Sequence, residues 1–129
     1  VLAYNMSFEK GVIRKLANLY VDFTYELMSI HDNMQDLMVP FQKKWYVTPS
    51  MQGSYSIKYV LPAIVPEMEK AYKDLDLIHN GGEAMNAYAN MSNLPYEEKM
   101  AYRKALLEYC KLDTLAMVKI HAVLKVYYE

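Results

Sequence analysis

A tyrosine and an aspartate four residues apart are the pair whose types and spacing could do chemistry together. Tyr109 and Asp113 lie in a stretch without glycine or proline, and the i, i+4 spacing on a helix lets two side chains meet. Asp113 falls at the centre of an apolar stripe, so its carboxylate must be hydrogen-bonded, paired or bound to metal, because burying a bare charge is costly. Two interpretations stay open: an aspartate hydrogen-bonded to a nearby backbone group or tyrosine, and a metal ligand. The stripe comprises Tyr102, Leu106, Tyr109, Cys110, Ala116, Met117, Ile120 and Leu124.

A second acidic residue, Glu9, stands at the predicted junction of a strand and a helix. Residues 1–4 form a short apolar run that favours a strand. Asn5 or Ser7 is a suitable N-cap for the helix that follows. Glu9 lies in the first turn of that helix, where a carboxylate complements the helix dipole by about 0.3–1 kcal/mol. Apolar residues repeat at helical spacing along it, at Phe8, Val12, Leu16 and Leu19.

The elements between these two helices read as further helices with short interruptions. We expect one or two extended pieces and a mainly helical fold in a single partial domain, residues 1–129. The longest helix, capped by Ser92 or Asn93, should run from Tyr96 to about Val126 and be central to the packing. The other expected elements are a helix from Tyr25 whose far end by Met38 becomes a strand running into Val39-Pro40, an extended segment over Lys43–Pro49, a helix over Ile57–Leu61 that Pro62 ends or kinks, a helix from Pro66 toward Asp74, a break at His79-Asn80-Gly81-Gly82 and a helix over Glu83–Met91.

Composition narrows the class of protein. Apolar residues make up 53% of the 129 and charged residues 22%, which excludes a disordered chain. The net charge of −1 does not indicate a basic surface of the kind that binds nucleic acid. Cys110 is the only cysteine, which excludes an internal disulfide framework and fits a reducing compartment. No apolar run approaches the roughly 20 residues that span a bilayer, so we expect a cytoplasmic chain. It begins at Val1 without a methionine, which we interpret as a piece of something longer.

The residues around Glu9 and Asp113 resemble two of the three motifs of the DEDD exonuclease superfamily, whose fold is RNase H-like. An Asn-x-x-Phe followed by an acid at the mouth of a helix resembles the second motif, and Tyr109-x-x-x-Asp113 resembles the third motif of the tyrosine subclass. The match is closest to an uncharacterised bacterial domain family that bears this signature, and it covers nearly the whole chain. Its features are similar to Tyr4-Asn5-x-Ser7-Phe8-Glu9, Gly53-Ser54-Tyr55-Ser56-Ile57-Lys58 followed by Val60-Leu61-Pro62, and Tyr109-Cys110-x-x-Asp113-Thr114-x-Ala116-Met117.

The resemblance implies two-metal hydrolysis of a nucleic-acid phosphodiester, in the 3′ to 5′ direction. Two Mg²⁺ or Mn²⁺ ions hold the scissile phosphate and activate the attacking water, and such hard cations take carboxylate oxygens. It implies that Glu9 and Asp113 are metal ligands, that Tyr109 orients or activates the water, and that Asn5 and Lys58 contact substrate. Cys110 is expected to be a core residue beside the site. We do not expect metal ligands among His31, His79 and His121, which are scattered.

Two departures from the pattern limit what this chain should do by itself. The second-motif acid is Glu9 where classical members carry aspartate. The first motif, an Asp-x-Glu pair on the leading strand, is missing, and most of the sheet goes with it. The chain therefore resembles the helical C-terminal portion of an RNase H-like fold. We expect it to bind divalent metal weakly and to turn over nothing.

Two alternatives remain open. One is a non-catalytic helical module that binds another protein, or a second copy of itself, through apolar surface exposed by truncation. The other is a member of the nuclease fold that binds nucleic acid without cleaving it. The sequence does not separate DNA from RNA as the partner, because no base-stacking or groove-reading element is recognisable.

Overall fold

The computed structural model describes residues 1–128 and is mainly helical, as the sequence predicts. It forms two compact units, an N-terminal unit over Val1–Val60 and a C-terminal unit that begins at Leu61. The boundary falls inside helix α4 (Ile57–Ile64). The single partial domain expected from the sequence stays a prediction.

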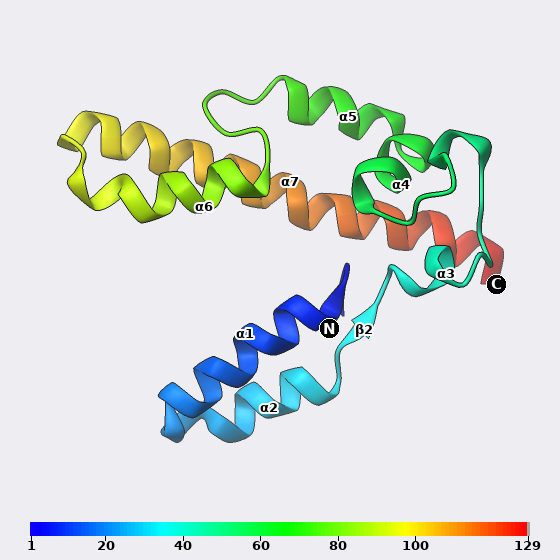
Figure 1. Ribbon diagram of the computed structural model, residues 1–129, viewed down its shortest axis with the longest axis horizontal. Coiled ribbons are helices and arrows are strands. Elements are labelled where there is room, and N and C mark those ends of the chain that lie inside the picture. Colours follow the sequence, from blue (N-terminus) through cyan, green and yellow to red (C-terminus); the bar gives the residue numbers. More distant parts are fainter. Residues whose placement is uncertain (129) are drawn as a thin grey trace. The chain divides into compact units, whose positions relative to one another are not determined.

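A two-stranded parallel sheet and a helical hairpin make up much of the N-terminal unit (Figure 1). Strand β1 pairs with β2 so that Leu2 faces Gln35 and Ala3 faces Asp36. Helices α1 and α2 pack side by side, and in the sequence both lie between β1 and β2. In order, the elements are β1 (Leu2–Ala3), α1 (Met6–Leu19), a 3₁₀ turn (Val21–Phe23), α2 (Thr24–Asp32), β2 (Gln35–Asp36), α3 (Val39–Gln42) and a second 3₁₀ turn (Pro49–Met51).

Aromatic rings fill the part of the N-terminal unit that follows β2. The buried ring of Phe41 stacks on Tyr4 with centroids 6.3 Å apart and meets Tyr46 edge-on at 5.8 Å. The Tyr4 hydroxyl donates to the carbonyl of Tyr55 over 2.6 Å, which ties β1 to the loop before α4. Offset and edge-to-face pairs are favoured ring geometries. The start of α1 is therefore held against residues far along the chain.

The apolar stripe of α1 does not face the core, contrary to what its periodicity suggests. Phe8 and Leu19 are 65% and 70% exposed, and Val12 and Leu16 are also exposed. Ala17, on the other side of α1, is buried. On that other side, Met6 and Ile13 are half-buried as well.

The long helix α7 (Tyr96–Tyr128) organises the C-terminal unit (Figure 1). Helix α5 (Pro66–Lys73) and helix α6 (Gly81–Asn90) both pack on it, and a 3₁₀ turn (Met91–Asn93) joins α6 to it. The central position predicted for this helix is confirmed. Its buried residues include Ala116, Ile120 and Leu124.

Several predicted boundaries are confirmed and others are wrong. The strand before Asn5, the strand after α2 and the helix that starts at Pro66 are all present. Of the two outcomes predicted for Pro62, an end of the helix is wrong, since α4 continues to Ile64, and a kink stays a prediction. Ser92 and Asn93 lie in the 3₁₀ turn, and α7 begins after Pro95 instead of after either of them.

Two further expectations about single residues and turns need correction. The break predicted at His79-Asn80-Gly81-Gly82 is present at His79 and Asn80, whereas Gly81 and Gly82 begin α6 without positive φ. The strand expected to run into Val39-Pro40 ends at Asp36, and Val39–Gln42 forms the helical turn α3, which has Pro40 near its start, where proline is preorganised for a helix. None of the described helices combines the length and the apolar character that crossing a membrane requires.

Candidate functional site

The junction between β1 and α1 is held by the carboxylate of Asp36. Its Oδ1 accepts the backbone N–H groups of Asn5 and Met38, both at 2.9 Å, and its Oδ2 accepts that of Met6 at 3.0 Å. Asn5 occupies the predicted N-cap position in a left-handed conformation, with φ 66°, and its side chain caps no helical N–H. Its Oδ1 accepts the hydroxyl of Ser7 instead. Sequence reasoning missed Asp36, which does the capping from 31 residues away.

Glu9 lies in the first turn of α1, as expected, and is half-buried. Its Oε2 is shielded from solvent, and no residue in the described part of the chain is hydrogen-bonded to it. A shielded carboxylate oxygen without a donor is costly unless something supplies one. The Oε2 atom of Glu9 can therefore still accept a hydrogen bond or bind a cation.

Asp113 belongs to a small polar cluster in the C-terminal unit. The Tyr72 hydroxyl, from the last turn of α5, donates to Asp113 Oδ1 over 2.6 Å. The ring of Tyr109 meets that of Tyr72 edge-on, with centroids 6.1 Å apart and planes at 67°. Asp113 is half-buried, as its place on the stripe predicts. The predicted hydrogen bond between the carboxylate of Asp113 and a tyrosine is confirmed. The sequence analysis did not identify Tyr72 as that tyrosine.

Both tyrosines of this cluster hold their protons more tightly than a free tyrosine. Burial, followed by the charge of Asp113, raises the pKa of Tyr109 to about 12. Burial and the hydrogen bond to Asp113 raise the pKa of Tyr72 even further. Both hydroxyls are therefore protonated at neutral pH and can act as hydrogen-bond donors.

The first residue of α6 lies beside the hydroxyl of Tyr109. A Cβ added to Gly81 would sit 3.7 Å from that oxygen, an ordinary van der Waals contact. The helix start is fixed by Asn80, whose side chain accepts the N–H of Glu83 at 3.0 Å. One side of the cluster is therefore bounded by the backbone at the start of α6.

Lys58 and Cys110 are both on the surface. Lys58 is exposed in the first turn of α4, so its predicted substrate contact stays a prediction. Cys110 is exposed, and the expectation of a core residue is wrong. Cys110 stands at the margin of the apolar stripe of α7, whereas Ile120, near the centre of the same stripe, is buried.

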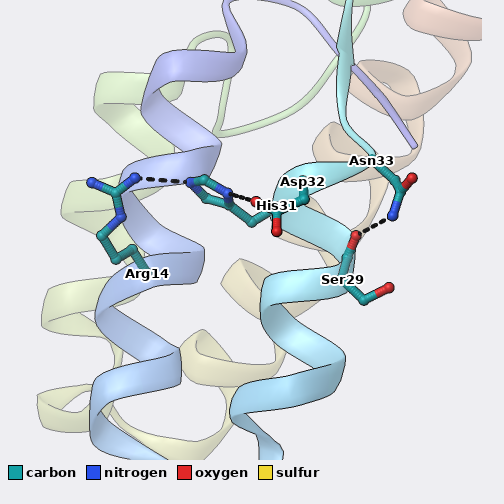
Figure 2. A network of polar contacts seen from close by, with 5 residues as sticks. All are labelled: Arg14, Ser29, His31, Asp32 and Asn33. Carbon is teal, nitrogen blue, oxygen red and sulfur yellow. Dashed lines mark hydrogen bonds and ion pairs between the residues drawn. The ribbon is translucent and has the colours of Figure 1, made fainter.

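His31 and His79 contact charged side chains, and His121 is exposed. His31 is buried, and Figure 2 shows its ring between Arg14 and Asp32. Its Nδ1 lies 2.8 Å from Asp32 Oδ1, and its Nε2 lies 3.2 Å from a guanidinium nitrogen of Arg14. Arginine only donates, so Nε2 is the acceptor and Nδ1 carries the proton toward Asp32. His79 contacts Glu83, and His121 is exposed.

A groove between α6 and α7 has a volume of about 370 Å³ and is lined partly by Glu83 and Glu98. Two carboxylates on its wall oppose the entry of a phosphate backbone. We therefore do not include the groove in the candidate site.

The metal ions implied by the resemblance can be tested against the donors that are present. The carboxylate oxygens of Glu9 and Asp113 are the chemistry that Mg²⁺ and Mn²⁺ prefer. Glu9 offers an oxygen without a donor, whereas the carboxylate of Asp113 is hydrogen-bonded by Tyr72 and also by Tyr109. Within residues 1–128 no group of three histidine, cysteine, aspartate or glutamate side chains is arranged to hold a metal ion. The two acids therefore fit the group in type and supply only part of a ligand set.

Comparison with known proteins gives one match to a family model, over the N-terminal part of the chain, and one to a longer protein, over nearly all of it. The model of a family described as a domain of unknown function, DUF2779, matches residues 1–56. That range includes Asn5 and Glu9 and stops before Tyr109 and Asp113.

An uncharacterised protein of Ureaplasma parvum serovar 3 is 28% identical over 142 residues. The alignment covers 96% of this chain and 20% of that relative, so the chain spans about one fifth of the relative's length. No solved structure matches the chain. In its first 56 residues the chain is thus similar to a family of unknown function, and along nearly all of its length it is similar to one segment of a longer protein.

Proposed function

We propose that this chain is part of a divalent-metal-dependent 3′–5′ exonuclease of the DEDD type and supplies its second and third motifs. The observation that carries the proposal is the shielded Glu9 Oε2, which has no donor among the described residues although it lies at a strand-to-helix junction. A shielded carboxylate oxygen without a donor needs a positive partner, and a bound divalent metal ion would supply one. The RNase H-like fold of the parent is part of the same proposal.

The proposal gives each site residue a role taken from the resemblance. Glu9 and Asp113 would hold Mg²⁺ or Mn²⁺, which supply a Lewis acid and a more acidic bound water. Tyr109, with a pKa of about 12, keeps its proton and so orients the attacking water by hydrogen bonding. Asn5 and Lys58 would contact the nucleic-acid strand. DNA and RNA are equally acceptable to these groups.

The proposal is tested first by metal binding to the 129-residue chain. Titration with Mn²⁺, followed by the electron paramagnetic resonance signal of the free ion, should detect weak saturable binding. Glu9→Gln and Asp113→Asn should each weaken it at least tenfold, since each removes a charged ligand. Matched controls are Glu26→Gln on α2 and Glu108→Gln on α7, which remove exposed carboxylates.

A nuclease assay completes the test. With Mn²⁺ and end-labelled single-stranded DNA or RNA, the isolated chain should release no nucleotides, because half of the metal-binding carboxylates of the pattern are missing. Turnover that Asp113→Ala abolishes would contradict this expectation of inactivity. Equal Mn²⁺ affinity in the site variants and in the controls would contradict the proposal as a whole.

A second function, a non-catalytic helical module, is favoured by the exposed stripe of α1. A row of large apolar side chains in water is typical of an interaction surface, and a second copy of the chain is one partner for it. Sedimentation velocity should then show self-association that rises with concentration. The double variant Phe8→Ser, Leu19→Ser should stay monomeric, while the control Val118→Ser, at an exposed position of α7, should not change the behaviour. A monomeric unmodified chain at every concentration would exclude self-association.

A further inference from the structure

The groove between α6 and α7 is a feature of the C-terminal unit that the proposed exonuclease chemistry does not use. Its volume of about 370 Å³ lies within the range of about 300–1,000 Å³ that is usual for small-molecule sites. Each helix presents one face to it, because the lining positions recur at helical spacing. On α6 these residues are Glu83, Asn86, Ala87 and Asn90, and on α7 they are Glu98 and Tyr102.

The charge of this groove is negative, since its lining within the described part of the chain includes two carboxylates and no lysine or arginine. Glu83 lies in the first turn of α6 and Glu98 in the first turn of α7. The two helices pack side by side and are joined through a short 3₁₀ turn, so they run antiparallel (Figure 1). Their first turns therefore lie toward opposite ends of the groove. Such an arrangement is complementary to a ligand with a positive charge at each end.

Glu83 is held at its end of the groove. Its Oε2 accepts the backbone N–H of His79 over 2.8 Å and lies 3.2 Å from the Nδ1 of the same residue. These hydrogen bonds, the one from the backbone most strongly, lower the pKa of the Glu83 carboxyl, which is therefore ionised at neutral pH. Both contacts use Oε2, so Oε1 remains available to a ligand.

The rest of the lining offers apolar surface and a hydrogen-bond acceptor. Leu94 and Tyr102 are half-buried, and Leu77 is 50% exposed. A hydrocarbon chain that covers these side chains removes apolar surface from water. The side-chain N–H of Asn90 donates to the carbonyl of Asn86 over 2.8 Å, which leaves the amide oxygen of Asn90 as an acceptor.

We infer that the groove between α6 and α7 binds a linear aliphatic polyamine, of which a diamine is the simplest form. One ammonium group pairs with Glu83 and another with Glu98, while the methylene chain lies on the apolar lining. The ring of Tyr102 adds a face that attracts ammonium groups. A hard divalent cation fits less well, because it needs about six oxygen ligands around one point. Both carboxylates are exposed to water, so the affinity is modest.

The experiment titrates the 129-residue chain with hexamethylenediamine at low salt and follows the backbone amide signals by nuclear magnetic resonance. The signals of the groove residues should shift and reach saturation. Hexylamine, which keeps the hydrocarbon chain and lacks the second ammonium group, should bind about threefold more weakly. Glu98→Gln should weaken diamine binding by a similar factor. The matched control Glu97→Gln removes an exposed carboxylate of the same helical turn outside the groove and should leave the affinity unchanged.

A second pair of variants tests the shape of the groove. Ala87→Leu places a larger side chain in the groove and should abolish the saturable shifts. Ala89→Leu adds the same volume at an exposed position of α6 outside the groove and should bind hexamethylenediamine as the unmodified chain does. Circular dichroism shows whether each variant is folded. If Ala87→Leu is not, Glu98→Gln carries the test, because it replaces an exposed side chain.

Three outcomes would overturn the inference. Equal losses from Glu97→Gln and Glu98→Gln would mean that the diamine is held only as a diffuse counterion. Equal affinities for hexylamine and hexamethylenediamine would mean that the groove binds hydrocarbon without reading the second charge. An unmodified chain whose signals do not saturate has no such site. Glu9 and Asp113 do not line the groove, so none of these outcomes bears on the proposed metal site.

Discussion

Helices α1 and α7 both carry an apolar stripe at helical spacing, and the structure uses the two stripes in opposite ways. The stripe of α7 contributes Ile120 and Leu124 to the interior of the C-terminal unit, at 0% and 5% exposure. The stripe of α1 leaves Phe8 and Leu19 mostly exposed while Ala17 is buried. Periodicity therefore establishes that a segment is helical and which face is apolar, but it does not choose the partner of that face.

The two helix starts that carry asparagine differ in the same way. Asn80 is extended, and its side chain accepts a helical N–H of α6. Asn5 is left-handed, and the N–H groups beside it are bound by Asp36 from the neighbouring strand. The C-terminal unit thus caps a helix locally, while the N-terminal unit caps one through tertiary structure.

The largest expected effect tests the contrast between the two stripes. Ile120→Ala should lower the free energy of unfolding by about 2–5 kcal/mol, because it leaves a cavity at a fully buried site. Leu19→Ala, at a mostly exposed site, should change it by no more than about 0.5 kcal/mol. Urea denaturation followed by circular dichroism measures both. Similar losses from the two variants would mean that the α1 stripe is covered in solution.

The next effect concerns the cap of α1. Asp36→Ala removes the acceptor of three backbone N–H groups and should cost about 2 kcal/mol, the upper end for a helix cap. Hydrogen exchange at Asn5 and Met6 should speed up in the same variant. Asn5→Gly is the control and should be nearly neutral, because the side chain caps nothing and glycine accepts positive φ.

A smaller effect is expected at the locally capped helix. Asn80→Ala should destabilise the C-terminal unit by about 1 kcal/mol, since it removes the single side-chain acceptor for the N–H of Glu83. Thermal unfolding compared with Asn86→Ala, a change at an exposed interior position of α6, measures it. Equal melting temperatures for these two variants would show that the cap contributes nothing.

The smallest effect is a dependence on alkaline pH. The pKa of Tyr109 is raised from about 10 to about 12, so the folded state keeps a proton that the unfolded state loses in this interval. This contribution to stability is complete below pH 10 and is lost as the pH rises toward 12. Tyr72→Phe removes a second tyrosine with a raised pKa and should flatten the loss, whereas Tyr96→Phe, at a 76% exposed site, should not. Denaturation at a series of alkaline pH values gives the slope of the unfolding free energy against pH for each variant. Identical slopes for Tyr72→Phe and Tyr96→Phe would contradict the assignment of this loss to the buried tyrosines.

The candidate site shows the same division between local and distant information. Sequence spacing identifies Tyr109 and Asp113 as neighbours on one helix face, and the polar cluster around Asp113 agrees with that. The donor that actually reaches Asp113 is Tyr72, on another helix. No signal within one helical turn could have pointed to it. The exposure of Cys110 is likewise not contained in its spacing along α7.

The sequence by itself determined the helices, the short strand before Asn5, the helix start at Pro66 and the place of Glu9 in the first turn of α1, because propensity, capping and periodicity act over a few residues. Only the tertiary structure decided that Asp36 caps α1, that Tyr72 holds Asp113, and that the α1 stripe stays in water. Those contacts join residues 30 and 41 positions apart. Packing between elements selects such partners, and the local pattern of either partner does not contain that choice.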